Sequence, residues 1–200
     1  MKSDLVVTIS RQYGSGGREV GQKLAERLGI PCYDKELINL AAQQSGFSPS
    51  HFEEPDQQAT NSMLFSLLRA GTMMNSYDLP LNDKIYLIQS KVIQELAEKG
   101  PCVIVGRCSD YILEERPHCV KAFLYAPLPL RVERGEKAYG LPSDKAEDII
   151  VKTDKRRAAY YNYYTGIKFG DARHYNICLD TLSVGIESAV DTLEVYVKAF

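Results

Sequence analysis

Apolar residues along the chain fall into short continuous runs that alternate with longer stretches of helical spacing. The short runs are typical of buried strands, and they lie at 5–9, 30–33, 102–105, 119–125 and 176–179. Between them, apolar residues recur every three or four positions, which predicts helices at 20–28, 35–44, 63–74, 85–96, from 130 to a break at 140–142, and at 186–197. Strands that alternate with helices predict an α/β fold, in which helices cover both faces of a parallel sheet.

Local signals mark the ends of several of these elements. Gly29 follows the first predicted helix, where glycine favours the left-handed turn that ends a helix. Asp34 precedes the second predicted helix and Ser143 precedes a further basic helix. We expect the side chains of both residues to cap the N-termini of those helices. The polar segment 48–61 is expected to be an exposed connection.

The composition is that of an ordinary globular protein, with 44% hydrophobic and 25% charged residues. The length of 200 residues predicts one domain that spans 1–200. A net charge of -2 gives no bulk electrostatic argument for binding nucleic acid. No apolar run approaches the ~20 residues that a membrane span needs, and the first strand begins too early for a signal peptide to precede it. We therefore expect no membrane association and a cytoplasmic location.

The cysteines and histidines point to neither disulfides nor a metal site. The five cysteines are odd in number and form no C-x-x-C pair, so we expect reduced thiols in the core of a cytoplasmic protein. His51, His118 and His174 are scattered and lack the spacing of metal ligands, so no zinc site is expected.

The first strand leads into a glycine-rich loop at 10–19, SRQYGSGGRE, which opens a helix. Backbone N–H groups in such a loop turn inward and the helix dipole adds partial positive charge, so we expect the loop to bind phosphate. A Walker A motif reads G-x-x-x-x-G-K-[ST]. With its second glycine on Gly16, Arg11 stands at the first glycine, Gly17 at the lysine and Arg18 at the Ser/Thr. Arg18 is expected to reach a phosphate as a cation.

Further arginines follow later strands. Arg107 follows the strand at 102–105 after one glycine, at the carboxyl end where ligands bind in open α/β sheets. An arginine there can hold a phosphate through two N–H groups. Arg131 and Arg134 share a helix face, and Arg157 lies in the next basic segment. Acidic residues are interleaved with these last three, so composition alone leaves open whether they bind phosphate or form a solvated face.

Two apolar clusters receive no functional assignment. The tyrosines at 160, 161, 163 and 164 can stack on bases, but packing in a core or interface is more common. The apolar, methionine-containing helix at 63–74 is more often core than site.

Together these motifs resemble the cytidylate-kinase-like family, a divergent branch of the P-loop nucleoside monophosphate kinases, over nearly the whole chain. The segments that carry the resemblance are ISRQYGSGGRE at 9–19, YDKELI at 33–38, VGR at 105–107, FLYA at 123–126, DKRR at 154–157 and NICLDT at 176–181. The resemblance implies a three-layer P-loop NTPase-type fold with a five-stranded parallel sheet. It also implies a nucleoside-monophosphate-binding insertion at 35–84 and an arginine-bearing lid at 130–157.

The activity that this resemblance implies is transfer of the γ-phosphoryl group of ATP to a nucleoside monophosphate, foremost CMP or dCMP, with Mg²⁺ as a further cofactor. The ATP phosphates would be held by the loop residues Gly14, Ser15, Gly16, Gly17 and Arg18. The acceptor would be bound by Asp34 and Arg107. The catalytic cations would be Arg18, Arg131, Arg134 and Arg157. The expected partners are small nucleotide substrates, and a homo-oligomer is left open.

The chain departs from the family pattern at functional positions. Gly17 stands where typical cytidylate kinases have the Walker lysine, and Cys108 stands where they have an aspartate. Three interpretations therefore stay open: a monophosphate kinase, a kinase for another small molecule on the same fold, and a nucleotide-binding regulatory protein without activity. The missing lysine favours the last, whereas the retained arginines favour the first two.

Overall fold

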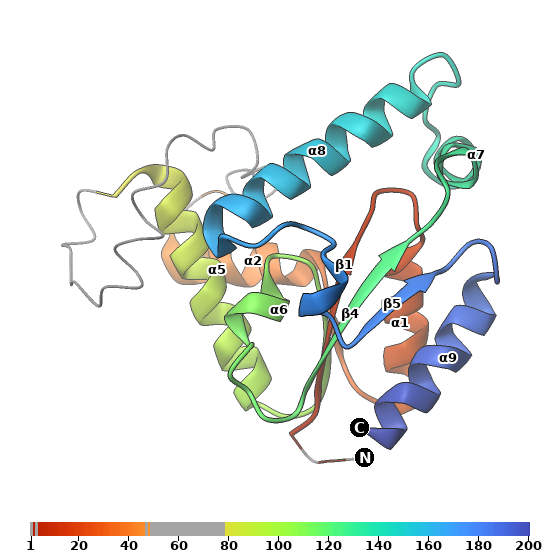
Figure 1. The fold of residues 1–200 in the computed structure, drawn as a ribbon. Coiled ribbons are helices and arrows are strands. Elements are labelled where there is room, and N and C mark those ends of the chain that lie inside the picture. Colours follow the sequence, from red (N-terminus) through yellow and green to blue (C-terminus); the bar gives the residue numbers. More distant parts are fainter. Residues whose placement is uncertain (1, 3, 47, 49–78) are drawn as a thin grey trace.

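A five-stranded parallel sheet forms the centre of the molecule in the computed structural model, which describes residues 2, 4–46, 48 and 79–200. The strands are β1 (Val6–Arg11), β2 (Cys32–Tyr33), β3 (Cys102–Val105), β4 (Cys119–Tyr125) and β5 (Ile177–Asp180). Their order in the sheet is β2-β3-β1-β4-β5, so β1 lies at the centre (Figure 1). The predicted fold class is confirmed.

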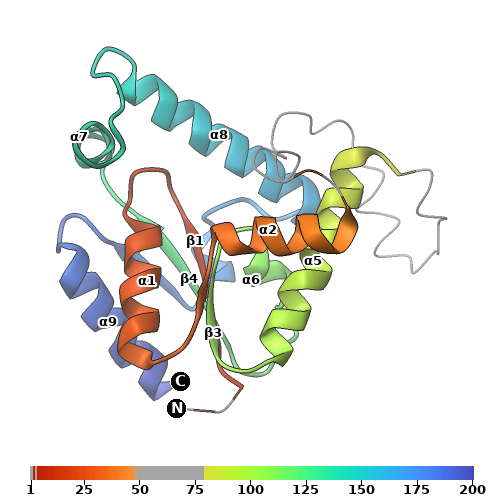
Figure 2. The ribbon, with the colours of Figure 1, turned by 180° about the vertical axis from the view of Figure 1, so that it is seen from behind.

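Helices cover both faces of this sheet. On one face lie α1 (Gly17–Leu28) and α9 (Ile186–Ala199), and on the other lie α2 (Lys35–Ser45), α5 (Leu81–Glu98) and the short α6 (Ser109–Ile112) (Figures 1 and 2). Side chains of a strand alternate between the two faces. Accordingly, Val7 and Ile9 join the core under α1 and α9, whereas Val6 and Ile104 join the core under α2 and α5.

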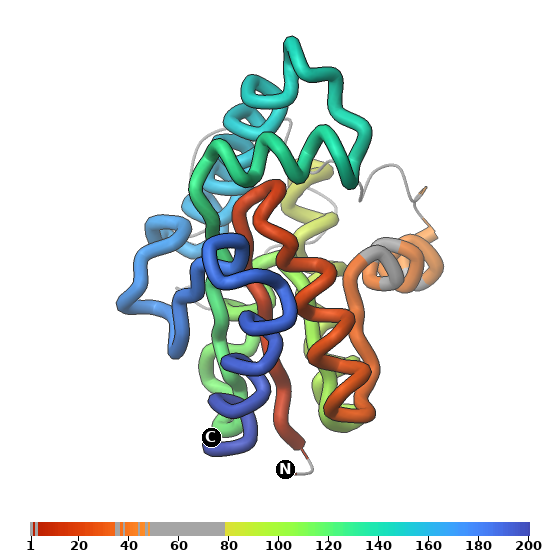
Figure 3. The backbone as a smooth tube through the Cα atoms, turned by 90° about the vertical axis from the view of Figure 1, so that its right-hand side faces the viewer, coloured from red at the N-terminus to blue at the C-terminus, as the bar shows by residue number. Residues whose placement is uncertain are grey.

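Two helices stand over the carboxyl edge of the sheet. They are α7 (Leu128–Tyr139) and α8 (Ala146–Thr165), and Figure 3 shows both above the loop that joins β1 to α1. The predicted lid at 130–157 falls within this pair, but α8 continues past it. The tyrosines at 160, 161 and 164 are buried in a cluster with Tyr86 and Cys108, so the preference for core packing is confirmed for these three.

Two predicted caps are wrong. Asp34 precedes α2 but makes no capping hydrogen bond with its side chain, because its carboxylate pairs with Arg11 and Arg18 instead. Ser143 does not cap α8, which begins at Ala146 with Lys145 in the capping position. The predicted helix at 63–74 lies outside the described residues, as do most of the predicted connection at 48–61 and much of the predicted insertion at 35–84.

The five cysteines, all in the described part of the chain, are thiols that form no disulfide, and Cys102, Cys108 and Cys119 are buried. Burial raises the pKa of the Cys102 and Cys119 thiols to about 11, so both stay protonated at neutral pH. None of the helices in the described part of the chain is long and apolar enough to cross a membrane.

Candidate active site

The glycine-rich loop is a tight turn between β1 and α1. Gly14 and Gly16 have φ values of +81° and +79°, a conformation that favours glycine. The Ser15 hydroxyl donates to the Gln12 carbonyl at 2.9 Å, and the Ser15 carbonyl accepts from the Thr181 hydroxyl. These bonds fix the loop from both sides, so its shape does not depend on a bound ligand.

A cavity of about 400 Å³, here called the loop cavity, opens beside this turn. It is lined by Arg11, Gln12, Tyr13, Gly14, Gly16, Gly17, Arg18, Tyr139 and Arg157. The loop cavity therefore contains four of the five residues predicted to hold ATP phosphates. The fifth, Ser15, is fully buried and serves the loop itself. Because α1 begins at Gly17, the positive end of its dipole lies at this cavity.

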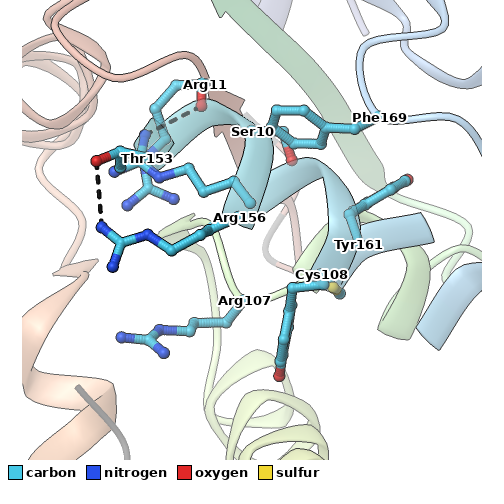
Figure 4. Close-up of a pocket in the computed structure, with 11 residues that line it drawn as sticks. Ser10, Arg11, Arg107, Cys108, Thr153, Arg156, Tyr161 and Phe169 are labelled. Carbon is cyan, nitrogen blue, oxygen red and sulfur yellow. Dashed lines mark hydrogen bonds between the residues drawn. The ribbon is translucent and has the colours of Figure 1, made fainter. Parts of the chain in front are cut away.

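A second cavity of about 210 Å³, here called the arginine cavity, lies beyond the carboxyl ends of β1 and β3. Its cationic residues are Arg11, Arg107, Arg156 and Arg157. Figure 4 shows the side chains of Arg11, Arg107 and Arg156 extending to one side, while Tyr161 and Phe169 lie on the other. The cavity thus has a cationic wall and an aromatic wall, and Arg107 lies where its place after the strand predicted.

The two cavities share Arg11 and Arg157. Arg157 donates to the Arg11 carbonyl at 3.3 Å and lies over the Tyr13 ring, with 5.3 Å between its guanidinium carbon and the ring centre. Burial and the nearby charge of Arg157 lower the pKa of the Arg11 guanidinium to about 9. None of the described residues that line the two cavities is acidic. An anion placed between them would therefore relieve repulsion among the cations.

Two predicted catalytic arginines lie outside the lining of both cavities. Arg131 is buried and donates to the carbonyls of Ala126 at 2.9 Å and Tyr13 at 3.1 Å, and it pairs with Asp154 at 2.5 Å. Asp154 also accepts from the Tyr13 amide at 2.6 Å. Arg131 therefore joins α7, α8 and the glycine-rich loop, which is a positioning role.

Arg134 likewise braces the start of α1. It pairs with Glu19 at 2.5 Å and lies over the Tyr139 ring at 5.7 Å. A side chain added at Gly16 would approach Arg134 Nε to 3.5 Å, so this cation lies close behind the loop.

Asp34 and Arg18 form an ion pair with each other. Asp34 also lies 3.7 Å from Arg11. The Arg18 side chain is 48% exposed, and it borders only the loop cavity. Asp34 lines neither cavity, and its carboxylate lies against Arg11 and Arg18.

Sequence reasoning missed Arg11 and Arg156 as candidates. Arg11 is the last residue of β1, and the rule that selected Arg107 at a strand end applies to it equally. It was overlooked because the predicted strand ended at residue 9. Arg156 lies in the basic run 155–157, and a charge run is usually a solvated face, so its position at the cavity was not expected.

A buried carboxyl group lies beneath the arginine cavity. Asp110 accepts hydrogen bonds from the Ser10 hydroxyl at 3.3 Å and the Tyr161 hydroxyl at 2.7 Å. Burial raises the pKa of the Asp110 carboxyl group, against these hydrogen bonds, which lower it. Since Ser10 and Tyr161 line the cavity, Asp110 holds two of its wall residues in place.

The described residues do not fit a protein-held metal ion. No cluster of three or more His, Cys, Asp or Glu side chains with metal-binding geometry occurs among them. At the loop, Arg18 occupies the place of the Walker hydroxyl that would bind Mg²⁺, and Asp34 is already paired with arginines.

A sequence profile of the cytidylate kinase-like family matches residues 6–183. The chain belongs to the cytidylate kinase-like family. It is 28% identical over 199 residues to the cytidylate kinase of Methanosarcina barkeri, covering 96% of each chain. The solved structure of an uncharacterized protein from Eubacterium ventriosum is similar with a TM-score of 0.73 and 28% identity, covering 98% of this chain and 99% of that one.

The fold is shared with kinases of other specificity. Shikimate kinase from Bacteroides thetaiotaomicron has a TM-score of 0.57 to this chain at 16% identity, over 97% of this chain and 98% of that one. At this identity the likeness concerns the P-loop kinase fold alone.

Proposed function

We propose that this family member transfers the γ-phosphoryl group of ATP to a nucleoside monophosphate, with CMP or dCMP as the preferred acceptor. The observation that carries the proposal is the meeting of the loop cavity and the arginine cavity at Arg11 and Arg157. A phosphotransferase needs a donor site and an acceptor site whose phosphates face each other in line. Two cavities that share cations at their junction meet this need.

The loop cavity is the donor site in this proposal. Backbone N–H groups of the turn and the N-terminus of α1 favour the charge of a polyphosphate there. The low exposure of Ser15 and its bonds to Gln12 and Thr181 keep the turn in shape before ATP arrives. The rigid loop lowers the ordering cost of binding.

The arginine cavity is the acceptor site. Arg107 and Arg156 lie on its cationic wall and would hold the acceptor phosphate, with Arg157 at the junction. The aromatic wall formed by Tyr161 and Phe169 offers apolar surface for the rest of the acceptor. Such positioning and charge stabilisation supply most of the rate in phosphoryl transfer.

The α7–α8 pair acts as the lid. It carries Arg156 and Arg157 on α8, while Asp154 binds the Tyr13 amide and Arg131. A closed lid keeps water from the transferred group, and this network holds α8 against the loop. Arg131 and Arg134 contribute by holding the loop and α7 rather than by touching phosphate.

The family implies a divalent metal in addition to ATP. Because the described residues do not fit a protein-held ion, we assign no residue to Mg²⁺ and rest no step on it.

The experiment is a coupled phosphotransfer assay with Mg-ATP and a panel of nucleoside monophosphates. Wild type should turn over CMP or dCMP, and Arg107→Ala should lower kcat/KM for the acceptor about 10- to 100-fold, because a charge-assisted bond to phosphate is lost. The matched control is Arg173→Ala, which removes an exposed arginine whose partner is Asp171. Absence of turnover across the panel, while calorimetry still detects bound ATP, would contradict the proposed acceptor class.

A further inference from the structure

The glycine-rich loop differs from a Walker A motif at three positions, and the differences at two of them, 11 and 17, are reciprocal. Arg11 stands at the first glycine and Gly17 stands at the lysine. A cation and a glycine have thus changed places between the two ends of the loop. If Arg11 binds the phosphates that the Walker lysine would bind, the motif is rearranged rather than lost.

The Arg11 side chain passes between two glycines. A Cβ atom built on Gly17 would lie 2.7 Å from Arg11 Cβ and 2.9 Å from Arg11 Cγ. A Cβ atom built on Gly106 would overlap Arg11 Nη1. Real Cβ atoms do not approach other atoms so closely. The Arg11 side chain can therefore adopt this conformation only because Gly17 and Gly106 lack side chains. A lysine at 17 and an arginine at 11 would compete for the same space.

The guanidinium of Arg11 lies at the junction of the loop cavity and the arginine cavity, which it helps to line. Asp34 is 3.7 Å away, while Arg157 and Arg107 add positive charge nearby. Arg18 is placed differently, since it is half-exposed, pairs with Asp34 and borders only the loop cavity. Of the two arginines, only Arg11 lies where a phosphoryl group would pass from donor to acceptor.

We propose that Arg11 is the phosphate-binding cation that replaces the Walker lysine, reaching the donor phosphates through the gap left by Gly17 and Gly106. This inference rests on the proposed function for its donor, ATP. It assigns to Arg11 the role that was expected of Arg18 from the sequence.

The first test measures ATP binding by calorimetry in Arg11→Met, Arg18→Met and the surface control Arg27→Met. Arg11→Met keeps an unbranched apolar chain between the two glycines and removes the charge. We expect about 10- to 100-fold weaker binding, because a charge-assisted contact to phosphate is lost. Arg18→Met should lose less and Arg27→Met nothing. Thermal unfolding of each variant shows whether it is folded.

The second test introduces glycine at position 11 and lysine at position 17, the residues that a Walker A motif has there. Gly17→Lys alone places a side chain against Arg11 and should weaken both folding and ATP binding. Arg11→Gly alone should bind ATP weakly. The double variant Arg11→Gly/Gly17→Lys restores the first glycine and the lysine of the Walker motif, and we expect it to bind ATP at least about tenfold more tightly than Arg11→Gly.

The outcomes separate this inference from the function on which it rests. If wild type binds ATP and folded Arg11→Met binds it equally well, Arg11 is not the replacement and the proposed function stands. A larger loss in Arg18→Met than in Arg11→Met would return the role to Arg18. A double variant no better than Arg11→Gly would overturn the exchange. If wild type binds no ATP, the proposed function fails and the inference fails with it.

Discussion

The outer face of α1 and α9 and the carboxyl edge of the sheet both carry arginine, but carboxylates balance its charge on the outer face, whereas several arginines gather at the carboxyl edge. On the outer face, Arg27 of α1 contacts Glu187 at 2.7 Å, Glu194 at 3.3 Å and Asp191, all on α9. Hydrogen bonds to these carboxylates, first of all Asp191, raise the pKa of the Arg27 guanidinium.

At the carboxyl edge, several arginines lie close together, and Asp34 pairs with Arg11 and Arg18. Arg11, Arg107, Arg156 and Arg157 line one cavity, and no described residue of that lining is acidic. Here burial and neighbouring cations lower the pKa of Arg11. An arginine whose charge is balanced by carboxylates, such as Arg27, helps to hold the fold together, because the protein itself supplies the counter-ion. Concentrated positive charge costs folding free energy and indicates that the counter-ion is a ligand.

The largest expected effect comes from breaking a balanced pair in the interior. Arg131→Met should lower the free energy of unfolding by about 3 kcal/mol, because it leaves Asp154 partly buried without its cation and two carbonyls without a donor. Urea unfolding measures this loss. A change below about 1 kcal/mol would show that Arg131 is not needed to hold the loop.

Removing an arginine charge from the carboxyl edge should have the opposite effect, with weaker ATP binding and a nearly unchanged free energy of unfolding. Arg157→Ala should weaken ATP binding about tenfold, since one charge-assisted contact is lost. Its free energy of unfolding should stay within about 0.5 kcal/mol of wild type, because relief of repulsion among the arginines offsets the lost contacts to the Arg11 carbonyl and the Tyr13 ring. Calorimetry and urea unfolding on the same preparation check both parts. A strong loss of stability with unchanged binding would place Arg157 among the structural arginines.

The buried carboxyl group of Asp110 extends this comparison to a side chain that is negative when ionised. The pKa of Asp110 is raised in the folded state by burial, so the folded protein binds this proton more readily than the unfolded chain does. The stability contributed by this group is therefore greatest below the unfolded pKa of about 3.9 and falls as pH rises through the folded pKa.

Asp110→Asn removes this titration and keeps an acceptor for Ser10 and Tyr161. The stability of the variant relative to wild type should therefore rise between pH 4 and neutral pH. Urea unfolding at several pH values measures the difference. A difference that is flat or falls with pH would mean that Asp110 is stabilised as a carboxylate.

The smallest effect is expected on the outer face. Arg27→Met removes an exposed cation, and exposed ion pairs are weak and screened by salt. We expect a slight loss of stability at low salt, none at high salt and no change in ATP binding. A loss that persists at high salt would show that the aliphatic part of Arg27, rather than its charge, holds α1 to α9.

Individual residues show how far sequence reasoning reaches in this site. Arg107 could be placed from sequence, because it lies two positions after the end of an apolar strand, and that end was predicted correctly. Arg11 obeys the same rule, but β1 extends two residues beyond its last predicted position, through the polar Ser10. Hydrogen bonds to β4 at Ser10 and Arg11 extend the strand there, and no local pattern reveals that pairing.

Sequence reasoning was less successful for the contacts of Arg18, Arg131 and Asp34. Arg131 was predicted to face phosphate, but Asp154, 23 positions later, holds it beneath the loop. Arg18 and Asp34 were assigned to different ligands, and they pair with each other. In each case the sequence identified a charged residue correctly and left its partner unknown.

The sequence by itself determined the order of strands and helices, the parallel sheet and the glycine turn, because these depend on neighbours a few positions away. Apolar periodicity places the strands and helices, and glycine permits the positive φ angles of the loop. Only the tertiary structure decided which arginines meet a carboxylate and which converge around a cavity. Charges act through space, and the fold brings together residues such as Arg11, Gly106 and Arg157 that are distant along the chain.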